Sequence, residues 1–151
     1  MYAFTLERPD SVADAARLVA AGAKPLAGGQ TLLASMKLRL SAPEQLVDLS
    51  GIKELTGITK NGNAITIGAM SRHLDVANNA DVKAAYPALA DLASRIGDRQ
   101  VRAMGTIGGS VANNDPAACY PSAVLASGAT IVTSRREIAA GWPASHSASP
   151  S

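Results

Sequence analysis

Two glycine-rich stretches, one around residue 28 and one around residue 108, constrain this chain more than any other feature. The first reads Leu-Ala-Gly-Gly-Gln-Thr-Leu from Leu26, and the second reads Gly-Thr-Ile-Gly-Gly-Ser from Gly105. Paired glycines let a backbone turn sharply and let another group approach its N–H donors closely. Two such loops on one short chain suit a ligand with two negative charges, such as the pyrophosphate of a dinucleotide.

Neither stretch matches a familiar phosphate-binding fingerprint. The chain lacks both the G-x-G-x-x-G of a Rossmann fold and the G-x-x-x-x-G-K-[ST] of a P-loop. Spacing alone therefore leaves each loop open between a structural turn and a ligand cradle. The hydroxyls of Thr31, Thr106 and Ser110 favour the cradle, because each can donate a hydrogen bond to a phosphate oxygen.

Residues 1–50 alternate between extended and helical patterns. Strands are predicted over 2–6, 24–27 and 45–49, and helices over 12–20 and 31–40. This order predicts a small parallel sheet with crossover helices. The first glycine loop then lies at the carboxyl end of the second strand, where open sheets of this kind bind ligands.

The remainder of the chain has a different pattern. Asn61-Gly62-Asn63 joins two short β runs and predicts a hairpin. Helices are predicted over 73–78, 86–96 and 121–125, the last strand over 129–133, and a short connection over 100–105. From Gly141 the pattern is lost, and Ser, Ala and Pro dominate. We predict that residues 141–151 are disordered, and the abrupt change favours a non-native tail.

Composition and charge narrow the classes of function. The net charge is only +2 and the charges are scattered, which argues against nucleic-acid binding. A single cysteine, Cys119, excludes an internal disulfide and a cysteine-built metal site, and we predict it as a small buried residue. The chain shows no membrane-length apolar run and no signal-peptide pattern, so we expect a cytoplasmic protein without a membrane span.

A few side chains invite individual interpretation. His73 is predicted to be an ordinary surface or capping histidine. Asp115 precedes Pro116 and is interpreted as a turn-forming residue in preference to a base. Tyr120 is open between a packing role and a place beside a ligand. The sequence offers no catalytic triad, carboxylate pair or metal-binding cluster.

The ordered set of motifs resembles the FAD-binding medium subunit of molybdenum hydroxylases, the family of xanthine dehydrogenase and aerobic carbon monoxide dehydrogenase. Ala27 to Leu33 is similar to the first flavin loop of this family, and Arg102 to Ala118 is similar to the second. Further similar stretches lie in register at Leu46–Leu49, Ile67–Met70 and Ile96–Asp98. The resemblance extends from about Tyr2 to Ile138.

The resemblance implies an α+β fold made of two FAD-binding subdomains. A small three-stranded α/β unit would occupy residues 1–55, and an α+β unit with a mainly antiparallel sheet would occupy residues 56–140. FAD would lie extended in the cleft between them. Members of the family continue well beyond this length. We therefore expect a chain truncated after about residue 138, with an incomplete second unit.

The resemblance also implies which residues contact FAD. The first loop would hold the pyrophosphate through Leu26, Ala27, Gly28, Gly29, Gln30, Thr31 and Leu32. The second would hold the diphosphate and ribityl side through Thr106, Gly108, Gly109 and Ser110, and Asp115 and Cys119 complete the set. Cys119 occupies a position where relatives often have an aspartate that contacts the cofactor. A cysteine cannot supply the same charge-assisted hydrogen bond.

The implied function is electron transfer within a larger complex. Electrons would leave a substrate at the molybdenum cofactor of a large subunit. They would pass through two-iron–two-sulfur clusters of a small subunit and reach FAD in this chain, which an external acceptor reoxidises. No residue here is expected to act as an acid or base, because the flavin performs the redox chemistry. The alternatives are a nucleotide- or anion-binding module without redox activity, and a non-functional fragment.

Overall fold

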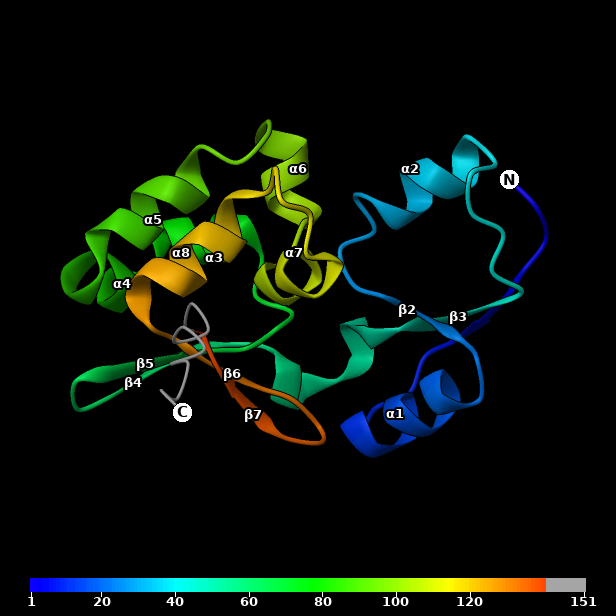
Figure 1. Ribbon diagram of the computed structural model, residues 1–151, viewed down its shortest axis with the longest axis horizontal. Helices are drawn as coiled ribbons and strands as arrows, with labels where there is room; N and C mark the ends of the chain where they lie inside the picture. Colours follow the sequence, from blue (N-terminus) through cyan, green and yellow to red (C-terminus); the bar gives the residue numbers. More distant parts are fainter. Residues whose placement is uncertain (141–151) are drawn as a thin grey trace, which may run out of the picture.

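The computed structural model describes residues 1–140 and places two groups of elements side by side (Figure 1). The predictions made for residues 141–151 lie outside these described residues. The first group consists of β1 (Thr5–Glu7), α1 (Val12–Ala20), β2 (Lys24–Leu26), α2 (Leu32–Lys37) and β3 (Gln45–Asp48). The predicted order of strands and helices over residues 1–50 is confirmed.

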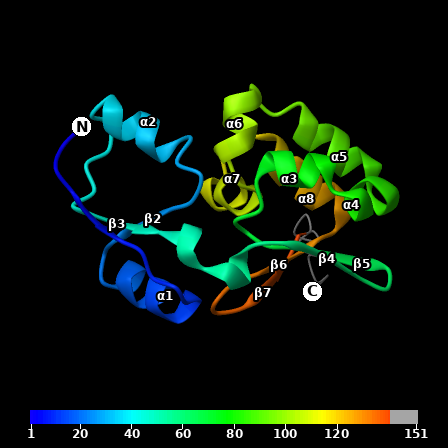
Figure 2. The ribbon, with the colours of Figure 1, turned by 180° about the vertical axis from the view of Figure 1, so that it is seen from behind.

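The first group is built on a three-stranded parallel sheet in the order β1-β3-β2. Successive side chains of the central strand β3 point to opposite faces, and both Leu46 and Val47 are fully buried. Helices α1 and α2 cover opposite faces of the sheet, as the two views in Figures 1 and 2 show. On the α1 face, Val47 packs in a cluster with Ala15, Ala23 and Ile52.

A short linker fastens the first group to the second. It forms two single turns of 3-10 helix, Leu49–Gly51 and Lys53–Leu55, with the buried side chain of Ile52 between them. A Glu54 carboxylate oxygen accepts a hydrogen bond from the Val12 N–H at 2.9 Å. The Leu55 carbonyl accepts a hydrogen bond from the Met70 N–H at 2.7 Å. The linker is therefore bonded to both groups.

The second group is mostly helical and carries two separate antiparallel hairpins. Its elements are β4 (Ile58–Asn61), β5 (Ala64–Ile67), α3 (His73–Asn78), α4 (Ala80–Ala85), α5 (Pro87–Ser94), α6 (Arg99–Met104), α7 (Ile107–Asn113), α8 (Cys119–Ser127), β6 (Thr130–Val132) and β7 (Glu137–Ala139). The core gathers Val76, Ala77, Val82, Ala90, Ala93 and Tyr120. Small residues at these contacts let the helices approach closely, and Tyr120 fills the remaining volume. The predicted mixed fold of helices and small sheets is confirmed.

The structure confirms one local prediction and corrects others. The hairpin at Asn61–Asn63 is confirmed, with Gly62 at a φ of +59°. Strand β7 was not predicted, and residues 99–104 form helix α6 where a connection was expected. The helix predicted over 31–40 ends at Lys37, because Arg39 adopts a φ of +59° and turns the chain away.

No helix within residues 1–140 combines the length and the apolar character needed to span a membrane.

We expect the substitution Leu46→Ala to lower the free energy of unfolding by about 2–5 kcal/mol, because it leaves a cavity in the central strand of the parallel sheet. Urea denaturation followed by circular dichroism measures the change. Leu38→Ala is the matched control, since this leucine is 71% exposed and its loss should change stability by no more than about 0.5 kcal/mol. Equal effects of the two substitutions would contradict this description of the sheet.

Candidate functional site

The two glycine-rich stretches meet at the junction between the two groups of elements. A Cβ atom added to Gly28 would overlap the Met104 carbonyl oxygen and lie 2.7 Å from the Gly105 Cα. A Cβ added to Gly109 would lie 3.2 Å from the Ala27 Cβ. Figure 1 shows the loop between β2 and α2 reaching α7 at this point. The glycines are therefore needed here because the two backbones touch with no room for a side chain.

The first stretch presents a row of unused backbone donors. Gly29 adopts a φ of +71°, and the Gln30 amide donates to the Gly28 carbonyl at 3.3 Å, which holds the loop in a tight turn. Among residues 1–140, no acceptor takes a hydrogen bond from the backbone N–H groups of residues 28–32. Unpaired N–H groups on consecutive residues form an anion-binding concavity, so this loop can receive a phosphate group.

The second stretch is different, because most of its backbone N–H donors are already used. The N–H groups of Ile107 and Gly108 donate to the carbonyls of Ser71 and Ala69 at 3.0 and 2.8 Å. The Gly109 N–H donates to the Thr106 hydroxyl oxygen at 3.1 Å. The second stretch was predicted as a glycine loop, but from Ile107 it is the first turn of helix α7, and its contact with FAD stays a prediction.

What the second stretch can offer a ligand is hydroxyl groups. The Ser110 N–H donates to the Thr106 carbonyl at 3.1 Å. The Ser110 hydroxyl is a separate polar group on the first turn of α7. Thr106 is buried at the junction. Gly108 is required for packing, since a Cβ there would lie 2.5 Å from the Ala69 Cβ.

A cleft of about 300 Å³ opens beside the contact between the two stretches. It is lined by Ala27, Gly28, Ser50, Thr56, Gly57, Met70, Ser71, Arg72, Asp75, Met104 and Thr106. Three predicted site residues, Ala27, Gly28 and Thr106, meet here. The remaining predicted residues do not line this cleft. Sequence reasoning did not single out Ser71, Arg72 or Asp75, although they directly follow the family-like stretch that ends at Met70.

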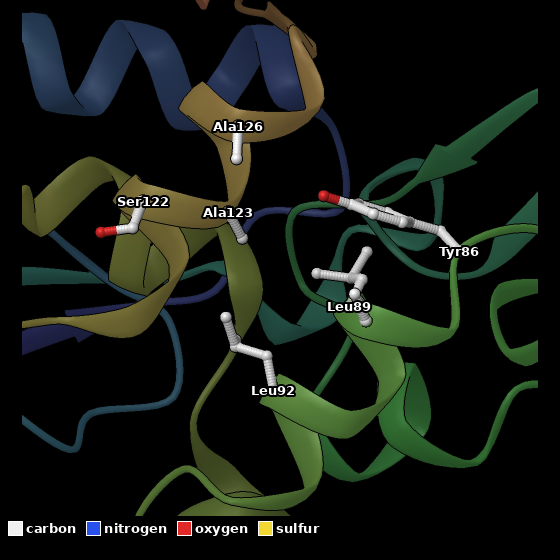
Figure 3. Close-up of a pocket in the computed structure, with 7 residues that line it drawn as sticks. Tyr86, Leu89, Leu92, Ser122, Ala123 and Ala126 are labelled. Atoms are coloured by element: carbon white, nitrogen blue, oxygen red, sulfur yellow. The ribbon is translucent and has the colours of Figure 1, made fainter.

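A second cavity, of about 270 Å³, lies between α5 and α8. In Figure 3, Tyr86, Leu89 and Leu92 lie on one side and face Ala123 and Ala126 of α8 on the other. Its lining contains no charged residue and none of the glycines. This cavity is therefore unsuited to a phosphate group and separate from the junction.

The two predicted residues beyond α7 both lie on the surface. The Asp115 carboxylate accepts a hydrogen bond from the Ala117 N–H at 2.8 Å, which confirms Asp115 as a turn-forming residue. Cys119 is exposed, so its prediction as a buried residue is wrong. It is the first residue of α8, and the next residue, Tyr120, takes the buried position instead. Across residues 1–140, no three His, Cys, Asp or Glu side chains gather in a way that could hold a metal ion.

His73 is buried, so its prediction as a surface or capping histidine is wrong. Only 5% of its surface is exposed, and its ring centroid lies 5.3 Å from that of Tyr120. Burial lowers the pKa of His73 below its ordinary value and raises the pKa of Tyr120. A polar residue that opens a short helix is normally exposed. The His73 ring is enclosed by contacts with Tyr120 and Gly105, which are distant from it in the sequence.

Comparison with known proteins identifies the family to which this chain belongs. The family model described as "FAD binding domain in molybdopterin dehydrogenase" matches residues 2–146. The chain belongs to this family of FAD-binding domains.

Individual relatives agree with the family model. The chain is 42% identical over 126 residues to the carbon monoxide dehydrogenase medium chain of Hydrogenophaga pseudoflava, covering 82% of this chain and 44% of that one. It is 38% identical over 133 residues to the glyceraldehyde dehydrogenase medium chain of Sulfolobus acidocaldarius, covering 87% and 47%. The structure of carbon monoxide dehydrogenase from Oligotropha carboxidovorans superposes with a TM-score of 0.86 at 38% identity, covering 93% and 52%. The chain thus spans about half the length of the relatives it matches.

We expect Gly28→Ala to weaken FAD binding and to cost about 1–3 kcal/mol of stability, because the new methyl group overlaps the Met104 carbonyl and must push the two stretches apart. Fluorescence titration with FAD and thermal denaturation measure the two effects. Gly62→Ala is the control, since nothing lies within 4 Å of the added Cβ, although its own φ of +59° makes the substitution strained. It should cost stability through strain and leave FAD affinity unchanged, and a loss of affinity in both variants would argue against the junction.

We expect the thermal stability of the chain to fall as the pH drops below about 6.5, because the unfolded chain then binds a proton at His73 that the folded chain excludes. The loss begins near the unfolded pKa and is complete below the lowered folded pKa. The measurement compares melting temperatures at about pH 7.5 and about pH 5.5 in the wild type and in His73→Gln, which cannot titrate there. Parallel curves for the two proteins would show that His73 does not contribute.

Proposed function

We propose that this chain is the FAD-binding part of an electron-transfer subunit in a cytoplasmic molybdenum hydroxylase. The observation that carries the proposal is the junction itself, where the free N–H groups of residues 28–32 lie beside a glycine contact that brings α7 close. Membership of the FAD-binding family and similarity to medium chains of two dehydrogenases support it.

The residues of the junction fit the pyrophosphate of FAD. Its oxygens need several hydrogen-bond donors with no side chain in the way, and the first glycine stretch offers such donors. The hydroxyls of Thr31 and Ser110 can add donors from either side. Because the net charge of the chain is only +2, oriented backbone N–H groups must supply much of the attraction for the anion.

We assign the predicted FAD contacts to the two stretches in unequal roles. The first stretch would bind the pyrophosphate with its backbone, because its donors are free. The second would contribute the side chains of Thr106 and Ser110, while Gly108 and Gly109 allow close packing. We further propose that the boundary between the two FAD-binding subdomains lies at residue 55, within the linker that both groups of elements hold.

When bound, FAD supplies the redox chemistry that lets a subunit of this kind accept electrons from iron–sulfur clusters and deliver them to an external acceptor. The residues of this chain bind and orient the cofactor and need not move a proton. The proposed partners are a large molybdenum-binding subunit and a small iron–sulfur subunit. Their presence would place the flavin within reach of the electron donor.

The test is titration of the purified chain with FAD, FMN and ADP, followed by quenching of flavin fluorescence and by calorimetry. FAD should bind more tightly than FMN, because FMN lacks the pyrophosphate, and more tightly than ADP, because ADP lacks the flavin. ADP binding as tight as FAD binding would favour a nucleotide-binding module without redox activity. Binding of none of the three would overturn the proposal for this chain.

We expect Cys119→Asp to raise FAD affinity about tenfold, because a carboxylate can accept a charge-assisted hydrogen bond that a thiol cannot. The position is exposed at the start of α8, so the substitution requires no repacking. Cys119→Asn is the matched control, since it has the same size as aspartate and no charge. Equal affinities for the two variants would remove residue 119 from the proposed cofactor contacts.

A further inference from the structure

Four layers stack through the junction, from the first glycine stretch into the core of the second group. Gly28 lies on the Met104 carbonyl and the Gly105 Cα. Gly105 in turn lies on the edge of the His73 ring, where an added Cβ would come within 2.5 Å of Nε2 and 2.9 Å of Cδ2. The ring of Tyr120 follows, with its centroid 5.3 Å from that of His73. Neither Gly28 nor Gly105 has space for a Cβ atom.

Backbone hydrogen bonds fix the third layer to the second. The His73 N–H donates to the Gly105 carbonyl at 2.9 Å, and the Ile107 N–H donates to the Ser71 carbonyl at 3.0 Å. This antiparallel bridge, centred on Arg72 and Thr106, sets the direction of the chain between α6 and α7. The His73 ring also lies directly against the Gly105 backbone.

The polar atoms of this stack indicate that the ring has a role besides filling space. His73 Nδ1 and the Tyr120 hydroxyl are both buried, and neither has a hydrogen-bond partner among the described residues. Buried polar atoms without partners are rare because they cost free energy, so each one calls for an explanation. An aliphatic side chain would fill a core position without this cost.

We propose that His73 is a positioning residue for FAD binding, whose ring sets the spacing between the two glycine-rich stretches. The proposal rests on the proposed function, because FAD is the ligand that the stretches would hold. The ring is planar and rigid, and burial keeps it neutral by lowering its pKa. It therefore holds the Met104–Gly105 backbone at a fixed distance from helix α3. This backbone contacts Gly28 and so keeps the N–H donors of the first stretch in place.

The test uses two amide substitutions that differ in reach. His73→Gln places a planar polar group near the position of Nε2, under Gly105, and should keep FAD affinity within about threefold of the wild type. His73→Asn has the same amide but is one methylene shorter and stops short of Gly105. It should lower FAD affinity about tenfold, which corresponds to about 1.4 kcal/mol, and should alter the visible circular dichroism of the bound flavin.

Val76→Ala is the control for loss of core packing alone. Val76 is fully buried in the same helix and in the same core cluster as Tyr120, but it does not support Gly105. It should lower the melting temperature and leave FAD affinity and the flavin spectrum unchanged. Equal FAD affinities for His73→Asn, His73→Gln and Val76→Ala would overturn the positioning role.

Amide hydrogen exchange of the chain without cofactor separates this inference from the proposed function. In His73→Asn, the N–H groups of Ile107 and Gly108 should exchange about tenfold faster than in Val76→Ala at matched global stability. If the wild-type chain binds no FAD, the proposed function fails and the exchange rates still decide whether His73 holds the second stretch. Equal rates in the two variants would overturn the positioning role.

Discussion

The contact of Gly28 with the Met104–Gly105 backbone is the interaction on which the site depends. Two main chains approach here to a distance that excludes a Cβ atom. Only glycine permits this, and the contact fixes the first stretch against the beginning of α7. The parallel sheet positions Gly28, and the helical core positions Met104 and Gly105. Both groups of elements therefore determine this contact.

The two glycine stretches look alike in sequence and have different tasks in the structure. The first keeps its backbone donors free and is the part of the junction suited to bind a phosphate group. The second uses its donors to bond the carbonyls of Ala69 and Ser71 and to begin helix α7. Its glycines serve close packing, because Gly108 lies on Ala69 and Gly109 on Ala27. In the proposed function, the first stretch binds the pyrophosphate with its backbone, and the second adds close packing and the side chains of Thr106 and Ser110.

Support for the junction reaches deep into the second group. The His73 ring carries the Gly105 backbone and packs near Tyr120, which is fully buried in a core otherwise built from small and β-branched residues. A core of this kind tolerates little change of volume, because its helices are already close. The proposed positioning role of His73 would couple the two glycine stretches to this aromatic pair, and it accounts for two buried polar rings in an aliphatic core.

The sequence alone determined the local periodicities, and with them the strand–helix alternation of residues 1–50, the hairpin at Gly62 and the family resemblance carried by the two stretches. These depend on neighbours along the chain, so they can be read from it. Other features became visible only in the folded chain: residues 99–104 form a helix, the second stretch begins a helix, and His73 is buried while Cys119 is exposed. The reason is physical: burial and close backbone approach depend on partners distant in sequence, such as Met104 for Gly28 and Gly105 for His73.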